Sequence, residues 1–285
     1  MNRLLGMTLA AIWIVAMAML IRRDVLPFWT AKDPPARLIP DGHYQVGICD
    51  EHGRRLGATW ITTTVAPTCS IVRSKTILDL GKVGGLLAQA RQLILKSELT
   101  YMQDGSLQEF AFQLIAAGIH GRVNGERYGR DFACRAEIGP ISKTVALDGE
   151  LSQYLGESLR PFTHLQNLHV GQSWRIRLLD PFRLLTEQRL EFTTQVATVT
   201  KREAIEHDGR QVDCFRIESE GATAWADESG RVLRQEVSIP ILGKFVLTDE
   251  PFDQEASAAA LSSKDRGTVT EHGGADEDGR RSGPR

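Results

Sequence analysis

Short alternating segments separated by glycine turns constrain this chain more than any other feature of its sequence. The pattern is clearest over residues 211–237, which read QVDCFRIESEGATAWADESGRVLRQEV. Phe215 and Ile217 fall on one face of an extended strand, and Arg216 and Glu218 fall on the other. A period of two, bounded by turns that contain glycine, is typical of an antiparallel meander with one face in water. This stretch therefore predicts a fold rather than a chemistry.

Similar segments follow one another from residue 43 to residue 249. Asn124-Gly125 and Asp208-Gly209 are predicted hairpin turns, because both residue pairs accept the positive φ angles of tight turns. A sheet of many strands must curl or split to cover its apolar face. We therefore predict a mainly β fold. It consists of one large, curved, antiparallel sheet resembling half a barrel, with one or two short helices and an N-terminal transmembrane helix. A helical piece over 151–159 is expected to fill or cover the concave side.

The N-terminal segment is strongly apolar. Leu4 to Ile21 contains 18 residues without a charge. A helix of that length measures roughly 27 Å at about 1.5 Å per residue, close to the hydrocarbon thickness of about 30 Å. The competing interpretation is a cleaved signal peptide, because Ala16-Met17-Ala18 fits a small-x-small cleavage site. The apolar run continues past that site, which favours an uncleaved anchor.

The orientation of the anchor depends on the basic residues around it. Arg3 precedes the segment, and Arg22, Arg23, Lys32 and Arg37 follow it. Read literally, the positive-inside rule places the large domain in the cytoplasm, but long domains are translocated largely regardless of charge. We expect a single-pass membrane protein with its β domain outside the cytoplasm.

The composition divides the chain into four parts. Residues 1–24 form the membrane anchor, and residues 25–42 form a linker that contains prolines. Residues 43–252 form the β domain. Residues 253–285 are polar, with no aromatic residue after Phe252, and are predicted to be a disordered tail.

Composition and motifs argue against several functions. The formal net charge of -2 disfavours a general nucleic-acid binder, which usually carries a basic excess. The segment Asp50 to Gly53 is interpreted as a turn rather than a metal site. The sequence predicts no catalytic residue, no metal ligand and no cofactor. The four cysteines form no C-x-x-C pair, and they are either buried free thiols or paired in one of three ways: Cys49, Cys69, Cys134 and Cys214.

Several motifs carry a family resemblance: VGQSW (170–174), LDPF (179–182), VDCFRI (212–217), WADESGRVLRQE (225–236), GRRLGA (53–58) and residues 101–112. With them, the sequence resembles a β-sheet domain of bacterial envelope proteins that is often found ahead of a transglutaminase-like domain. Such domains are similar to the lipoprotein-carrier (LolA/LolB-like) half-barrel, which implies a curved sheet with a concave apolar face. The resemblance implies a bacterial protein of the inner (cytoplasmic) membrane. No transglutaminase core of Cys, His and Asp follows here, so the resemblance implies no enzymatic activity.

Four aromatic residues are the candidate binding residues. We expect Trp174, Phe192, Phe215 and Trp225 to point toward a common interior, where they either pack as core or line an apolar groove. The predicted function is a non-enzymatic, membrane-anchored module of the cell envelope that binds a partner protein or an apolar, lipid-like ligand. The alternatives are a structural accessory subunit of a membrane complex and an enzyme that uses thiol chemistry.

Overall fold

A computed structural model describes residues 2–21, 26–31, 41–82, 91–116, 119–139, 141–147, 155–157, 160–163, 165–179, 192–239 and 243–262. Its helices are α1 (Asn2–Leu20), α2 (Leu26–Thr30), the short 3-10 helix η2 (Leu80–Lys82) and α4 (Gln254–Ser262). The strands of the first half are β1 (Gly42–Asp50), β2 (Arg55–Val65), β3 (Cys69–Asp79), β4 (Gln92–Met102), β5 (Leu107–Ala116), β6 (Ile119–Tyr128), β7 (Asp131–Ile138) and β8 (Ile141–Leu147). The strands of the second half are β9 (Leu155–Glu157), β10 (Ser173–Leu179), β11 (Phe192–His207), β12 (Arg210–Ser219), β13 (Ala222–Ala226), β14 (Val232–Ile239) and β15 (Gly243–Glu250).

All fifteen strands belong to one sheet, in the order β8-β7-β6-β5-β4-β3-β2-β1-β15-β14-β13-β12-β11-β10-β9. Each half of the chain adds its strands in sequence order, and the two halves meet where β1 pairs with β15. Every neighbouring pair is antiparallel except β9 and β10, which run parallel. The predicted mainly β fold with one large antiparallel sheet is confirmed.

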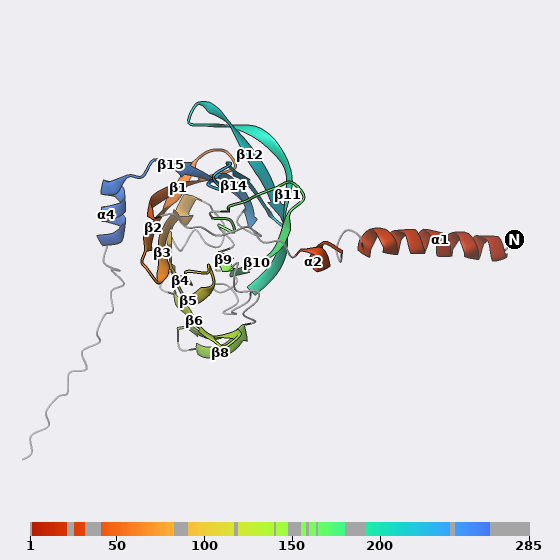
Figure 1. Cartoon of the computed structure of the whole chain (residues 1–285), viewed down its shortest axis with the longest axis horizontal. Helices are drawn as coiled ribbons and strands as arrows, with labels where there is room; N and C mark the ends of the chain where they lie inside the picture. The colour runs from red at the N-terminus through yellow and green to blue at the C-terminus, as the bar shows by residue number, and fades with distance from the viewer. Residues whose placement is uncertain are drawn as a thin grey trace, which may run out of the picture.

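The sheet curves so that its apolar face looks inward (Figure 1). One cluster of buried residues joins Ile48 of β1 and Leu93 of β4 to Trp174 of β10 and Phe245 of β15. Strands from both halves of the chain therefore share one core. We call the face that carries this core the interior face, and the opposite one the outer face. A second apolar cluster, which includes Phe110 of β5, Val123 of β6 and Phe132 of β7, continues the interior face across the first half.

The predicted turn at Asp208-Gly209 is confirmed, and the one at Asn124-Gly125 is wrong. Asp208 and Gly209 have φ angles of 49° and 71°, and they join β11 to β12 as a two-residue hairpin loop. Asn124 and Gly125 instead lie within β6. Gly125 pairs with Phe110, and a Cβ atom at Gly125 would overlap the Phe110 ring. The glycine is therefore required by the close approach of an aromatic ring to a strand.

Two other predicted segments differ from the structure. A helix was expected over 151–159, but residues 155–157 form β9, and the rest of that segment lies outside the described residues. The polar tail was expected to be disordered from residue 253, but Gln254–Ser262 forms α4. Asp253 begins that helix, because its carboxylate accepts the backbone N–H of Ala256. Residues 263–285 lie outside the described residues.

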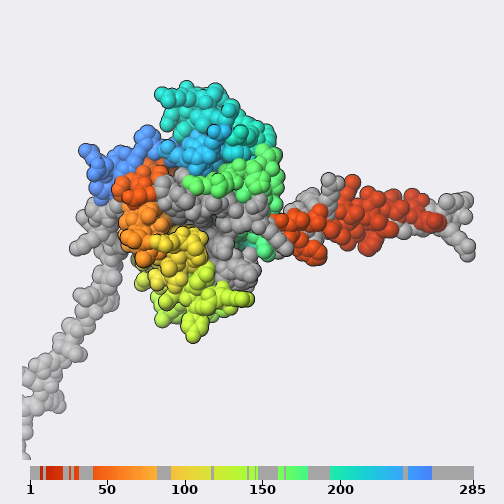
Figure 2. Space-filling view, viewed as in Figure 1, coloured from red at the N-terminus to blue at the C-terminus, as the bar shows by residue number. Residues whose placement is uncertain are grey.

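The predicted N-terminal helix forms as α1, which stands away from the sheet (Figures 1 and 2). The side chains described in this helix, at residues 7, 8 and 11–20, are exposed, with Ile12 62% and Trp13 64% accessible to solvent. Within the described ranges, no helix has the combined length and hydrophobicity that crossing a membrane requires.

An ion pair on the outer face supports the junction of the two halves. The Arg55 guanidinium donates two hydrogen bonds to Glu250, with Nη1–Oε1 at 2.6 Å and Nη2–Oε2 at 2.8 Å. Gln45 donates a further bond to the same carboxylate at 3.2 Å. Gly47 leaves the room that this carboxylate occupies, since a Cβ atom there would overlap it. Hydrogen bonding to Arg55 holds the pKa of Glu250 below its usual value.

The variant Glu250→Gln should lower the free energy of unfolding at neutral pH by about 1 kcal/mol. An ion pair that makes two hydrogen bonds but is partly exposed to solvent contributes about this much. A carboxylate whose pKa is lowered in the native state stabilises the protein at pH values above the pKa that the group has in the unfolded chain. This stabilisation is lost as the pH falls through the native-state pKa. The difference between parent and variant should therefore shrink on acidification. Urea unfolding across this pH range measures it, with the exposed Glu220→Gln as control. A difference that is independent of pH would contradict the prediction.

Candidate functional site

Two of the four predicted binding residues, Trp174 and Phe215, face the interior and belong to its core cluster. Trp174 is 1% exposed, and its ring meets that of Phe162 edge-on, with centroids 6.4 Å apart and planes at 77°. This geometry is a favourable aromatic contact. Phe192 begins β11, but its side chain lies outside the described residues. The structure therefore brings Trp174 and Phe215 together on one face.

The expectation that Trp225 shares this interior is wrong. The two-residue turn at Glu220-Gly221 pairs Arg216 with Trp225, and Phe215 with Ala226. Because cross-strand partners share a face, Trp225 lies on the outer face, opposite to Phe215. There its Nε1–H donates to a Glu203 carboxylate oxygen at 2.7 Å. The guanidinium groups of Arg216 and Arg234 lie 5.8 and 5.6 Å from its ring centroid, within cation–π range.

Sequence reasoning missed a segment that lies inside the sheet, residues 160–163 and 165–168, which we call the inner segment. Phe162 and Leu165 are 1% and 3% exposed and join the main core cluster. The side-chain amide of Gln235 holds the backbone of Phe162: the Phe162 N–H donates to Oε1 at 3.2 Å, and Nε2 donates to the Phe162 carbonyl at 2.9 Å. The Leu165 N–H donates to the carbonyl of Gly230 at 2.9 Å. A polar residue at an inward position of an alternating strand was the available signal, because a buried amide needs partners.

A charged group lies at the end of the interior face and consists of Asp249 on β15, Arg231 just before β14 and His207 at the end of β11. Asp249 is 6% exposed and accepts a hydrogen bond from Arg231. Burial raises the pKa of Asp249, and the charge of Arg231 opposes that rise. His207 Nε2 lies 3.9 Å from the Asp249 carboxylate, too far for a hydrogen bond. The arrangement is a buried ion pair with a histidine nearby, and it lacks the hydrogen-bonded relay of a nucleophilic triad.

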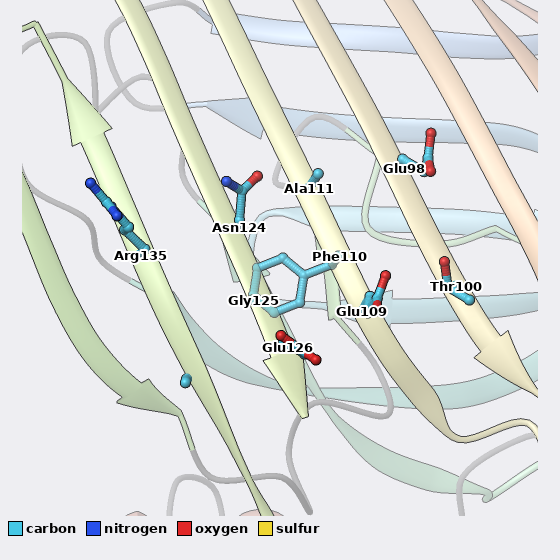
Figure 3. Close-up of a pocket in the computed structure, with 10 residues that line it drawn as sticks. Glu98, Thr100, Glu109, Phe110, Ala111, Asn124, Gly125, Glu126 and Arg135 are labelled. Carbon is cyan, nitrogen blue, oxygen red and sulfur yellow. The ribbon is translucent and has the colours of Figure 1, made fainter. Parts of the chain in front are cut away.

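The outer face of the first half carries two adjoining pockets that sequence reasoning did not predict. The pocket in Figure 3 has a volume of about 420 Å³ and lies over β4 to β7. Glu98, Glu109 and Glu126 line it, together with Arg135, whose Nε is 2.8 Å from Glu137. The view also shows the Phe110 ring beside Gly125, the strand position that lacks a side chain. This pocket is acidic, so it favours a neutral or positively charged group.

The second outer pocket has a volume of about 600 Å³ and lies over β2 to β6. It shares Glu98 and Ala111 with the first pocket. The available signal was the set of polar residues at alternate positions of β3, β4, β5 and β6, which share one face of a sheet. Its lining residues are Trp60, Thr62, Arg73, Ser74, Lys75, Lys96, Ser97, Glu98, Ala111, Gln113 and Arg122.

All four cysteines are free thiols, but only Cys134 and Cys214 are buried as expected, whereas Cys49 and Cys69 are half-buried. Burial raises the pKa of Cys134 and of Cys214 to about 11, and it also raises that of Cys49. A thiol with a raised pKa carries little thiolate at neutral pH and is a poor nucleophile. Around Asp50, the predicted turn is confirmed: the carboxylate accepts backbone N–H groups of His52 and Arg54. No cluster of metal-ligating side chains occurs in the part of the chain that the structure describes.

The chain shows only limited similarity to known proteins. No family model matches the chain, and no curated protein matches it. A DUF1089-family protein from Pseudomonas aeruginosa is 16% identical, with a TM-score of 0.34 over 65% of this chain and 90% of its own. The hypothetical lipoprotein YmcC from Escherichia coli is 12% identical, with a TM-score of 0.27 over 84% of this chain and 95% of its own. These TM-scores are too low to carry an argument about function, and neither description names a transglutaminase or a lipoprotein carrier.

Replacing Trp174 with alanine should lower the free energy of unfolding by about 3–5 kcal/mol, because the change empties a fully buried site. Trp225→Ala should cost less, since its ring, although 9% exposed, packs only in a small cluster with Cys214 and Leu233 on the outer face. Urea unfolding of the two variants provides the measurement, and each serves as the other's control. A larger loss for Trp225→Ala would mean that the outer cluster, and not the interior face, carries the stability.

Proposed function

We propose that the protein is a non-enzymatic module of the cell envelope, attached to a membrane through α1, that binds a partner protein or an apolar ligand within its curved sheet. The observation that carries the proposal is the inner segment. It fills apolar space that the two halves of the sheet enclose together, and it is a short irregular piece of chain rather than a layer of helices. Hydrogen bonds to Gln235 and Gly230 hold this segment in place.

An apolar ligand would compete with this segment for the interior. Phe162 and Leu165 present apolar groups to the core as a ligand would, and Trp174 and Phe215 supply aromatic surface to receive them. Ligand sites are usually concave and apolar with a few polar groups that fix orientation. Gln235 is such a group, because its amide donates one hydrogen bond and accepts another.

The membrane part of the proposal rests on α1. Its apolar side chains need cover from a lipid phase or a partner, and an uncharged run of 18 residues supports attachment to a bilayer. We place the protein at the inner membrane as a single-pass protein, with the β domain outside the cytoplasm. An accessory subunit of a membrane complex would use the same helix against other helices, and it remains the competing function.

A non-enzymatic role is supported by the chemistry of the described groups. The raised pKa values of Cys49, Cys134 and Cys214 disfavour thiol catalysis, the third function considered. The distance of 3.9 Å between His207 and Asp249 leaves the histidine without the hydrogen bond that orients a general base.

The variant Gln235→Ala should loosen the inner segment, because it leaves the buried N–H and C=O of Phe162 without their partners. We expect a loss of about 1–3 kcal/mol in the free energy of unfolding. Binding of an apolar fluorescent probe should increase at the same time, since the probe then displaces the inner segment more easily. Titration of the full-length protein in detergent with the probe measures the second effect. The exposed Gln211→Ala is the matched control and should change neither quantity.

One outcome of this titration, and one outcome of a separate purification from native membranes, would count against the proposal. If Gln235→Ala lowers stability without any change in probe binding, the segment is a fixed part of the core. If native preparations contain a stoichiometric membrane protein and no lipid or other apolar ligand, the accessory-subunit function replaces the proposed one.

The full-length protein should remain in the membrane fraction after washing with alkaline carbonate and with high salt, because α1 is apolar throughout its middle. Replacing Ile14 with Asp should release it, since a charge inside the hydrocarbon is costly. The exposed Val65→Asp, on the β domain, is the control. A mature protein that begins at Met19 would instead establish a cleaved signal peptide.

A further inference from the structure

The outer pocket over β2 to β6 concentrates positive charge in a protein that is slightly acidic as a whole. Four of its lining residues are cationic and one is acidic, so its formal charge is four minus one, or three positive, against -2 for the chain. The acid, Glu98, already binds Arg73, with Oε2–Nε at 2.8 Å. The excess charge therefore comes from Lys75, Lys96 and Arg122, and it makes the pocket suited to an anion.

Lys75 and Lys96 are direct partners across β3 and β4. Like charges at directly opposed positions destabilise a sheet, whereas opposite charges stabilise it. The same two strands also contain a favourable pair of opposite charges, because Arg73 lies opposite Glu98 two positions away from the lysines. Lys75 is only 4% exposed, so water screens this repulsion poorly. Both lysines also interact with other groups of the protein, and an anion between them would add to those contacts and offset the repulsion.

A buried donor supplies a second and independent sign of a ligand. Trp60 lines the same pocket, and its Nε1–H is buried without a hydrogen-bond acceptor among the described residues. Buried donors in native proteins are nearly always satisfied, by protein groups, water or a ligand. Phosphate oxygens are strong acceptors that several donors can share.

The adjoining pocket indicates what the other end of the ligand carries. It shares Glu98 with the basic pocket and adds Glu109 and Glu126 (Figure 3). A ligand that extends from the lysines into this second pocket meets carboxylates. The complementary ligand is negative at one end and positive at the other.

We propose that the two outer pockets together bind a phosphate ester that also carries an ammonium group, of which phosphoethanolamine is the simplest example. The phosphate lies between Lys75 and Lys96 and accepts from Trp60, and the ammonium group lies beside Glu98, the glutamate that both pockets share. Such a group occurs free in solution or as the headgroup of a phospholipid. The site lies on the face opposite to the interior, so it is independent of the function proposed above.

Calorimetric titration of the full-length protein in detergent with phosphoethanolamine and with inorganic phosphate tests the proposal. Lys96→Gln should weaken binding of both compounds about tenfold, the effect of losing one charge-assisted hydrogen bond. Glu98→Gln should weaken binding of phosphoethanolamine alone, because Glu98 lies two positions from Lys96 on β4. Lys143→Gln removes an exposed lysine of β8 outside both pockets, and it should change neither.

Each remaining result supports or overturns a defined part of the proposal. Absence of binding by the parent, or equal weakening by Lys143→Gln, overturns it entirely. Equal effects of Glu98→Gln on both compounds overturn the ammonium assignment. Binding of the protein to phosphatidylglycerol vesicles, with and without added phosphatidylethanolamine, distinguishes a lipid headgroup from a free ligand. If phosphatidylethanolamine increases vesicle binding and Lys96→Gln abolishes the increase, the ligand is the lipid headgroup. If only the soluble compound binds, the ligand is a free phosphate ester.

Discussion

The pairing of β1 with β15 is the interaction on which the rest of the structure depends. Among the described strands, every other neighbouring pair joins consecutive strands of the chain, whereas this one joins Gln45 to Glu250. Closing so long a loop costs entropy, but that cost grows only slowly with length. It is offset by a ladder of backbone bonds and by the Arg55–Glu250 ion pair. The shared interior exists only once this junction has formed, because its core cluster draws residues from both halves.

The curvature of the sheet gives its two faces different chemistry. On the interior face, apolar residues close around the inner segment, and the buried polar groups Gln235 and Asp249 each have defined partners. Partnered polar groups inside a core favour a single arrangement, because any shift would leave them unsatisfied. On the outer face, charged side chains stand at alternate positions and line the two pockets of the first half. The two proposed binding sites therefore use opposite faces, and a variant in one leaves the other intact.

Much of the fold followed from the sequence, and some errors could have been avoided. Alternation identified most of the strands between residues 43 and 249, and Asp208-Gly209 gave the correct hairpin. The two-residue turn at Glu220-Gly221 also fixes Trp225 opposite Arg216, so its outer position was present in the sequence. The outer pockets were harder to predict, because they need the order of β2 to β6 and the register of Lys75 against Lys96.

The sequence by itself determined where the chain is extended, which residues share a face within each strand, and that α1 is apolar. Those properties are local, since they depend on side-chain period and on turn chemistry. Only the tertiary structure decided that Asn124-Gly125 continues a strand, because the ring of Phe110 on the neighbouring strand occupies the space beside Gly125. It alone also placed Phe162 inside the sheet, and it joined β1 to β15. Both results require contacts between residues far apart in the chain, and no local pattern encodes such contacts.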